Sequence, residues 1–212
     1  MRSCIILCGG LSKRMGLDKG SMKIQNKPMI NHILEALNGQ IDEVVIVLND
    51  DNRIKKYKKF IIQKNYSYKI YFTTDEDINV GPIGGVKTGL KHINSDYGLV
   101  LPCDSPYIEN DFVYYMFDTL EALLEDEENK DLKALVPYHR SPNDVNIIKR
   151  AEPLHTIFKK DLLPIIDELI EANIHRVRLI MKNQKCFFIP IDNHLIYDTN
   201  FKNINRPSDL EE

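Results

Sequence analysis

The segment from Cys8 to Lys19 constrains what this chain can fold into more than any other part of the sequence. It reads Cys-Gly-Gly-Leu-Ser-Lys-Arg-Met-Gly-Leu-Asp-Lys, and it continues directly from the apolar run Cys4–Cys8. An apolar run that is this short and that ends in glycines predicts a buried strand. The loop then leaves the carboxyl end of that strand, which is where open α/β sheets bind their ligands.

The composition of this loop predicts that it binds a triphosphate. Adjacent glycines allow backbone N–H groups to approach and surround phosphate oxygens. Hydroxyl and cationic side chains add further donors to the same loop: Ser12, Lys13, Arg14 and Lys19. An ordinary glycine turn with solvated lysines is the alternative, but the density of glycines and cations argues against it.

The sequence of this segment matches neither of two common phosphate-binding loops. A P-loop requires Gly-x-x-x-x-Gly-Lys-Ser/Thr, whereas the sequence has Lys19-Gly20-Ser21 in another order. A dinucleotide fingerprint requires Gly-x-Gly-x-x-Gly running directly into a helix. Here Gly9 and Gly10 are adjacent, and a strand-like piece at 21–24 follows the loop.

Composition limits the class of protein. A chain of 212 residues with 43% hydrophobic and 28% charged residues suits one globular domain with a substantial core. The net charge of −3 gives no support to nucleic-acid binding. No apolar run reaches the roughly 20 residues that span a bilayer, and no signal peptide is recognisable, so we expect no membrane contact and a cytoplasmic location. The spacing of the four cysteines favours core thiols over a metal or disulfide framework.

Strand and helix patterns alternate along the chain, which predicts the α/β class: a three-layer, Rossmann-like domain with a mostly parallel mixed sheet. The expected strands are 4–8, 21–24, 44–48, 69–73, 98–101, 133–137, 145–148 and 185–189. The expected helices are 28–37, 53–63, 83–93, 110–125, 160–172 and a short one at 177–182. We see no second domain boundary in residues 1–212.

A candidate metal ligand follows one of the expected strands. Asp104 stands in Pro102-Cys-Asp-Ser-Pro106, where the strand 98–101 ends, so its carboxylate is expected on the same rim of the sheet as the glycine loop. Mg²⁺ commonly takes one or two carboxylates together with phosphates and waters. A turn or helix-cap role for Asp104 is the alternative.

At these residues the chain resembles the molybdenum cofactor guanylyltransferases. The family's usual text, Leu-Ala-Gly-Gly-x-Ser-x-Arg-Met-Gly-x-Asp-Lys, is followed over Leu7–Lys19, with Cys8 in place of the alanine. The resemblance is strong over Leu7–Tyr107, is patchy over Glu152–Leu210, and gives little signal over roughly 108–150. It implies a nucleotide-binding part at about 1–107 and an acceptor-binding part at about 150–210 of one nucleotidyltransferase domain.

The loop and the resemblance together define the expected site. Arg14, Lys19 and Asp104 are expected to be catalytic, with Asp104 also binding the metal. The residues expected to bind the substrates are Leu7, Cys8, Gly9, Gly10, Lys19, Asn49, Asp75, Gly81, Gly84, Asp104, Arg176, Asn203 and Asn205.

Several of these expectations have structural alternatives. Gly84 can serve a plain helix N-terminus, and Asn203 and Asn205 can serve a turn. Arg176 is placed by resemblance where the family binds its anionic acceptor, but it can also be a solvated surface arginine. His155, in the family's Pro-Leu-His turn, can touch a phosphate or be a satisfied structural histidine.

The implied reaction transfers GMP from Mg·GTP to the phosphate of molybdopterin-bound molybdenum and releases pyrophosphate. A phosphate monoester is mostly dianionic near neutral pH, so catalysis needs positioning and charge neutralisation rather than a general base. The alternatives are cytidylyl transfer to the same pterin, guanylyl transfer to a cobinamide phosphate, and a catalytically silent nucleotide-binding regulator. Transient contact with proteins that deliver or receive the cofactor is a further possibility.

Overall fold

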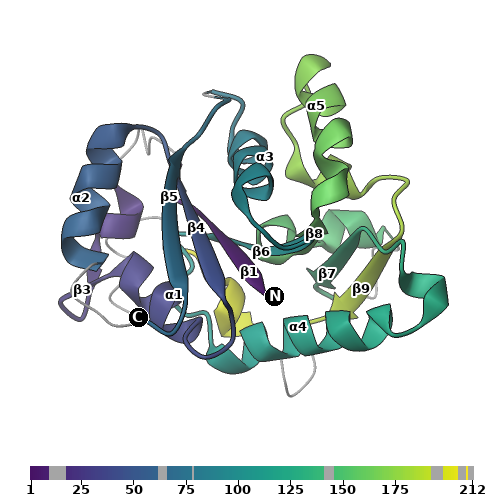
Figure 1. Cartoon of the computed structure of the whole chain (residues 1–212), viewed down its shortest axis with the longest axis horizontal. Coiled ribbons are helices and arrows are strands. Elements are labelled where there is room, and N and C mark those ends of the chain that lie inside the picture. The colour runs from purple at the N-terminus through teal and green to yellow at the C-terminus, as the bar shows by residue number, and fades with distance from the viewer. Residues whose placement is uncertain are drawn as a thin grey trace.

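One mixed sheet organises the molecule. The computed structural model describes residues 1–9, 18–61, 66–77, 79–140, 146–191, 198–204 and 209. Within them, seven strands pair in the order β5-β4-β1-β6-β8-β7-β9 (Figure 1). Their bounds are β1 Ser3–Leu7, β4 Glu43–Leu48, β5 Lys69–Thr74, β6 Tyr97–Pro102, β7 Ala134–Tyr138, β8 Ile157–Lys159 and β9 Cys186–Pro190. A separate antiparallel ribbon joins β2 (Lys23–Ile24) to β3 (Lys27–Pro28).

Only β8 runs against its neighbours in this sheet. It pairs antiparallel with β6 and with β7, whereas the other pairings of the sheet are parallel. The predicted α/β class with a mostly parallel mixed sheet is therefore confirmed.

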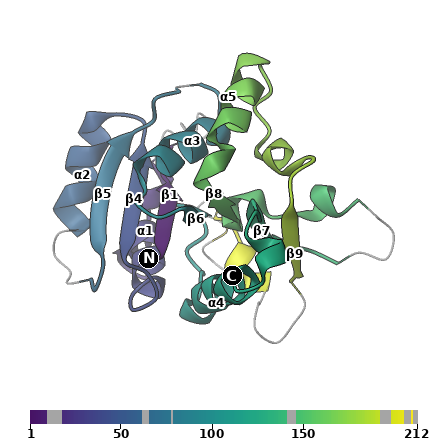
Figure 2. The same ribbon diagram turned by 45° about the vertical axis from the view of Figure 1, so that its right-hand side comes forward.

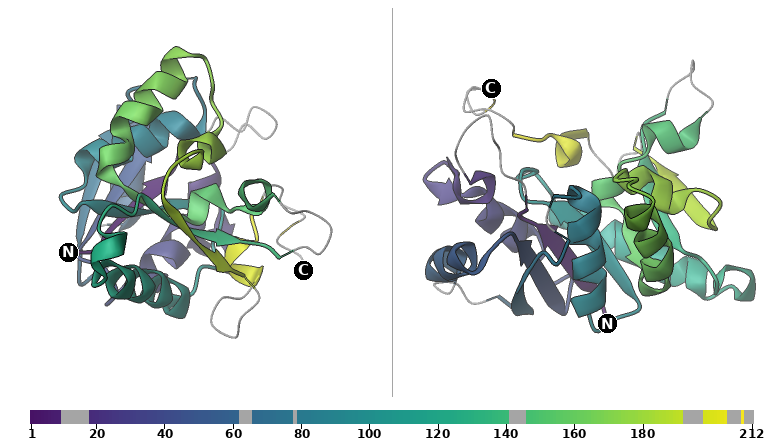
Figure 3. Two further views of the ribbon diagram at one scale, coloured as in Figure 1. Left: turned by 90° about the vertical axis from the view of Figure 1, so that its right-hand side faces the viewer. Right: turned by 90° about the horizontal axis from the view of Figure 1, so that it is seen from above.

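Helices cover both faces of the sheet and make the fold three-layered (Figures 1 and 2). The residues of β1 alternate between two cores: Cys4 and Ile6 pack with α1, α2 and α4, and Ile5 and Leu7 pack with α3 and α5. Figure 3 shows α3 and α5 side by side on their face. The helices are α1 Met29–Ala36, α2 Asp51–Ile61, α3 Pro82–His92, α4 Asn110–Leu124 and α5 Leu163–Glu171.

Short 3₁₀ helices make several of the connections. They are η1 Lys19–Ser21, η2 Glu127–Asn129, η3 Ile147–Arg150, η4 Pro153–His155, η5 Lys160–Leu162, η6 Val177–Met181 and η7 Asp198–Phe201. The helix expected over 160–172 is thus η5 followed by α5, and the short helix expected at 177–182 is the 3₁₀ helix η6.

The strand expected at 145–148 is wrong. Residues Ile147–Arg150 form η3, because the Asn146 side chain accepts a hydrogen bond from the backbone N–H of Lys149 and caps a helical turn. Val145 lies outside the described residues. The antiparallel partner of β7 is instead β8, whose three residues are too few to give a periodic signal in the sequence.

The strand order places a topological switch point between β1 and β6. From β1 the chain proceeds outward through β4 and β5, and then returns to pair β6 with the other edge of β1. In open α/β sheets, ligands bind outside the carboxyl ends of the strands at such a point. The register pairs Leu7 with Pro102, so the segments that begin at Cys8 and at Cys103 leave the sheet next to each other.

Candidate active site

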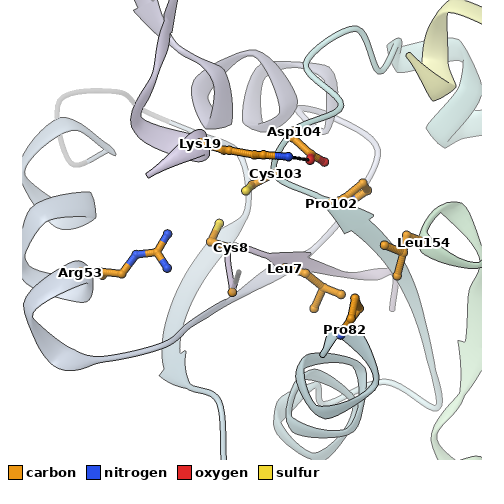
Figure 4. A pocket seen from close by; sticks show the side chains of 10 residues that line it. Leu7, Cys8, Lys19, Arg53, Pro82, Pro102, Cys103, Asp104 and Leu154 are labelled. Atoms are coloured by element: carbon orange, nitrogen blue, oxygen red, sulfur yellow. Dashed lines mark hydrogen bonds and ion pairs between the residues drawn. The ribbon is translucent and has the colours of Figure 1, made fainter. Parts of the chain in front are cut away.

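A cavity lies where β1 and β6 end, and its volume is about 230 Å³. Its lining comes from both strand ends and from the elements around them (Figure 4). The lining residues are Leu7, Cys8, Gly9, Lys19, Arg53, Pro82, Pro102, Cys103, Asp104 and Leu154. Of the expected site residues, Leu7, Cys8, Gly9, Lys19 and Asp104 are therefore brought together around one cavity.

An ion pair joins the glycine loop to the end of β6. Lys19 Nζ lies 2.8 Å from Asp104 Oδ2, and the two side chains are 21% and 18% exposed. These residues are 85 positions apart in the chain. The pair places a cation and a carboxylate at the same rim of the sheet, as expected from the sequence (Figure 4).

Asp18 fixes the turn that carries Lys19. Its carboxylate accepts a hydrogen bond of 2.6 Å from Arg53 Nη2 and another of 2.6 Å from Tyr57 Oη, both of them side chains of α2. Lys56 Nζ lies 3.4 Å from the other carboxylate oxygen. Burial alone would lower the pKa of Arg53, but the hydrogen bond and the charge of Asp18 raise it overall. Asp18 therefore anchors the loop to α2.

Gly20 is enclosed by two side chains and leaves no room for a Cβ atom. A Cβ added there would lie 2.4 Å from Tyr57 Oη and 3.3 Å from Cys103 Cβ. The close approach of the backbone to both neighbours explains why glycine follows Lys19 in the sequence.

Three further expected residues, Asn49, Asp75 and Gly84, gather beside Gly9, and a fourth, Gly81, precedes the helix that carries Gly84. A Cβ added to Gly9 would lie 2.8 Å from Asn49 Oδ1 and 3.9 Å from Asp75 Oδ2. A Cβ added to Gly84 would lie 3.1 Å from Asp75 Oδ1. Gly81 caps α3 with φ 76°, a conformation that favours glycine. The ends of β1, β4 and β5 and the start of α3 thus meet at one place.

Asp75 is held firmly within this group. Asp75 Oδ1 accepts hydrogen bonds from the Asp77 backbone N–H at 3.1 Å and from Thr88 Oγ1 at 3.3 Å. Burial raises the pKa of Asp75 although both hydrogen bonds act to lower it. Its second carboxylate oxygen, Oδ2, is the one on the side of Gly9.

The C-terminal segment is attached directly behind Asp104. The Ile204 backbone N–H donates to the Asp104 carbonyl oxygen at 2.8 Å, and Ser105 Oγ donates to Asn203 Oδ1 at 2.5 Å. His155 Nε2 lies 3.2 Å from the same serine oxygen. His155 is buried, and burial lowers its pKa to about 3, which favours the neutral form of the imidazole near neutral pH.

Arg176 is exposed and is not among the residues that line the cavity in the described part of the chain. The element that follows it, η6, packs against η4, which contributes Leu154 to the cavity. Arg178 is near enough to Glu152 to lower the pKa of that carboxyl, although burial raises it overall. Gly10, Arg14 and Asn205 lie outside the described residues.

The sequence did not single out Arg53 or Leu154. Arg53 both lines the cavity and binds Asp18. Its position soon after the end of β4, beside Asn49, was the available signal, because carboxyl ends of parallel strands carry site residues. Leu154 comes from the connection after β7, in the Pro-Leu-His turn that the sequence analysis considered for His155 alone.

The donors at the cavity fit Mg²⁺ that is bound together with a nucleotide. Among the described residues, no group of three or more His, Cys, Asp or Glu side chains is placed to hold a metal ion. Of the described residues that line the cavity, Asp104 is the one that offers a hard carboxylate. This fits Mg²⁺ as it binds with nucleotides, where one or two carboxylates suffice because phosphates and waters complete the octahedron.

A doubly wound sheet, with a glycine segment after β1 and an aspartate after β6 at its switch point, is a Rossmann-like nucleotide-binding arrangement, and the matching family model assigns it to the nucleotidyltransferases. Comparison with known families agrees. The model of the MobA-like NTP transferase domain matches residues 4–186, and the chain belongs to this family.

Curated relatives match the chain over nearly its whole length. A protein of Methanothermobacter thermautotrophicus named probable molybdenum cofactor guanylyltransferase is 30% identical, covering 98% of this chain and 96% of its own. The molybdenum cofactor guanylyltransferase of Aliivibrio fischeri strain MJ11 is 29% identical, covering 99% and 94%.

A solved structure shows the same fold. Molybdopterin-guanine dinucleotide biosynthesis protein A from Archaeoglobus fulgidus superposes with a TM-score of 0.70 at 22% identity, over 99% of this chain and 95% of that one. In the described residues, no helix is long and apolar enough to cross a membrane.

Proposed function

We propose that this nucleotidyltransferase transfers GMP from GTP to the phosphate of molybdenum-loaded molybdopterin and releases pyrophosphate. The observation that carries the proposal is the Lys19–Asp104 ion pair, which joins the glycine loop to a carboxylate at the switch point of the sheet. The names of the curated relatives support the choice of base and acceptor.

Each part of the cavity has a role in this proposal. The backbone at Gly9 receives the triphosphate, and Lys19 turns from Asp104 to the phosphate oxygens when the nucleotide binds. Asn49, Asp75, Gly81 and Gly84, which are not among the described residues that line the cavity, are proposed to contact the base. A carboxylate can accept from guanine N1 and N2, and Asp75 Oδ2 is the oxygen on the side of Gly9.

Charge neutralisation is the main catalytic task. The acceptor phosphate is already a nucleophile, so no general base is required. Lys19, and Arg14 from outside the described residues, are proposed to stabilise negative charge on the α-phosphate and the departing pyrophosphate. Asp104 would hold a Mg²⁺ ion, which supplies further positive charge to the triphosphate when bound.

The acceptor is proposed to bind on the side of the cavity formed by residues 150–210, opposite the nucleotide part at 1–107. Leu154, which belongs to η4, lines the cavity on this side. The helix η6, which begins directly after Arg176, packs against η4. Guanidinium groups suit phosphate, which they can bind through two hydrogen bonds. Asn203 belongs to the segment behind Asp104, and Asn205, outside the described residues, is proposed to contribute with it. A cytoplasmic location and contacts with cofactor-handling proteins stay predictions.

Pyrophosphate release tests this function. The protein is supplied in turn with GTP, CTP, ATP and UTP, each with molybdenum-loaded molybdopterin, with cobinamide phosphate or with no acceptor. We expect release with GTP and the pterin, and little with the other pairs. Preference for CTP, or for cobinamide phosphate, would assign the neighbouring activity instead. GTP binding without release, with every acceptor tried, would favour the silent regulator.

A further inference from the structure

Two cysteines lie side by side on the floor of the cavity. Cys8 follows β1 and Cys103 follows β6, directly after the register pair Leu7–Pro102. The Cys103 backbone N–H donates to the Leu7 carbonyl oxygen at 3.1 Å, so the ladder continues to this position. Figure 4 shows the two sulfur atoms pointing toward one another below the Lys19–Asp104 pair.

The spacing of the two residues suits a covalent bond between them. Neighbouring strands lie about 4.8 Å apart, and the Cα atoms of disulfides are usually about 4.4–6.8 Å apart. Both side chains point to the same face of the sheet, since both pack in the core with α1, α2 and α4. All four cysteines are free thiols; Cys4 is buried within β1 and Cys186 belongs to the edge strand β9.

In the reduced protein the two thiols are shielded from solvent, so they are not continuously reactive. Burial raises the pKa of Cys8, and the hydrogen bond with Cys103 raises it further. Cys8 is 1% and Cys103 is 7% exposed, yet both contribute to the wall of the cavity. A small oxidant therefore reaches them through the cavity that is proposed to receive the nucleotide.

We propose that Cys8 and Cys103 form an oxidation site, at which a disulfide forms on the wall of the nucleotide cavity and reversibly stops turnover. The oxidant is a two-electron acceptor of the hydroperoxide or azodicarboxamide class. The two thiols lose two protons and two electrons, and the S–S bond forms. A hydroperoxide O–O bond breaks to give water and an alcohol (two waters from hydrogen peroxide), whereas an azo group becomes a hydrazine.

The geometry explains why this bond would disturb the site. Disulfide sulfur atoms are about 2.05 Å apart, closer than two unbonded thiols can approach, so the bond locks the Cys8 and Cys103 side chains together on the wall of the cavity. Gly9 and Asp104 are the next residues along the two segments, and Cys103 Cβ already lies close to Gly20. The bond therefore ties the segment that carries Gly9 to the segment that carries Asp104, and it restricts the adjustment of both when a nucleotide enters the cavity.

The test uses the full-length protein and the azo oxidant diamide. After treatment and removal of the oxidant, we expect an intact mass lower by two hydrogen atoms and a non-reduced peptide that joins Cys8 to Cys103. Dithiothreitol should reverse both changes. These readouts do not depend on the proposed function. The accompanying loss of GTP-dependent pyrophosphate release, expected to be tenfold or more, does rest on it.

Matched variants make the result specific. The readout is each variant's activity after oxidation divided by its own reduced activity, so basal differences do not enter. Cys8→Ala and Cys103→Ser should lose the response, whereas Cys186→Ser should keep it. If no Cys8–Cys103 peptide forms, or if Cys8→Ala loses activity as wild type does, the site is refuted. If the peptide forms and turnover stays unchanged, the switching role is refuted.

Discussion

Replacing Gly20 with alanine should displace Lys19 by a steric mechanism that a second substitution can relieve. The added Cβ would lie 2.4 Å from Tyr57 Oη, which is the hydroxyl that donates to Asp18 at 2.6 Å. To reach an ordinary contact distance, the hydroxyl must move by about 1 Å and lose its hydrogen bond to the carboxylate. The cause is the side chain alone, because Gly20 is not among the described glycines with positive φ.

The magnitude follows from these two contributions. Overpacking a buried site costs about 1–3 kcal/mol, and a hydrogen bond to a charged group contributes about 1.5–3 kcal/mol. Tyr57→Phe alone loses the hydrogen bond. Gly20→Ala in the Tyr57→Phe background leaves only contacts of 3.3 Å, to the ring carbon and to Cys103 Cβ, and should add less than about 1 kcal/mol. We therefore expect a coupling energy of at least about 1.5 kcal/mol between the two substitutions.

Urea denaturation of the four proteins gives the unfolding free energies, and pyrophosphate release gives kcat/KM for GTP. A misplacement of about 1 Å can cost 10²-fold in rate, so Gly20→Ala should lose activity and the double variant should recover part of it. Gly39→Ala is the control: Gly39 has φ 82° and open space around it, so its substitution strains the backbone far from the cavity. Additive effects, with coupling below about 0.5 kcal/mol, would refute the steric explanation.

Four further substitutions test other parts of the molecule. Lys19→Ala should reduce turnover by about 10²–10³ with little change in unfolding free energy, measured by pyrophosphate release and urea denaturation; unchanged kinetics would remove Lys19 from the active site. Asp104→Asn should abolish turnover that depends on Mg²⁺, and wild-type rates at limiting Mg²⁺ would make Asp104 a turn residue. Arg176→Ala should weaken acceptor binding about 10- to 150-fold and leave GTP binding unchanged in paired titrations; the reverse pattern would place the acceptor site elsewhere. Burial alone would raise the pKa of Glu43, but hydrogen bonds from Ser3, Asn94 and Ser95 lower it overall. Its contribution to stability is therefore present above about pH 4.5 and is lost as the pH falls through the lower folded pKa, so the deficit of Glu43→Gln should shrink in acid; a deficit that does not depend on pH would contradict this.

The sequence predicted the elements whose signal is local. The strands that became β1, β4 and β6 are continuous apolar runs, and their burial on both faces of the sheet explains why the pattern was readable. The sequence also placed Lys19 and Asp104 at one rim, because carboxyl ends of parallel strands share an edge. The sequence did not predict β8, because three residues are too few to show the alternation of apolar and polar residues that marks a strand. It predicted a strand where η3 lies, because a short apolar run fits either element.

The tertiary structure decided which of these residues meet. The sheet order makes β1 and β6 neighbours, although their residues are more than 90 positions apart, and only then do Lys19 and Asp104 form an ion pair. The same order brings Cys8 beside Cys103, and the packing of α2 brings Tyr57 and Arg53 onto Asp18. Local sequence determines strands, turns and the chemistry of a loop, because those depend on neighbours in the chain. Which loops face one another depends on how the helices bury their apolar faces against the sheet, and that is a property of the whole fold.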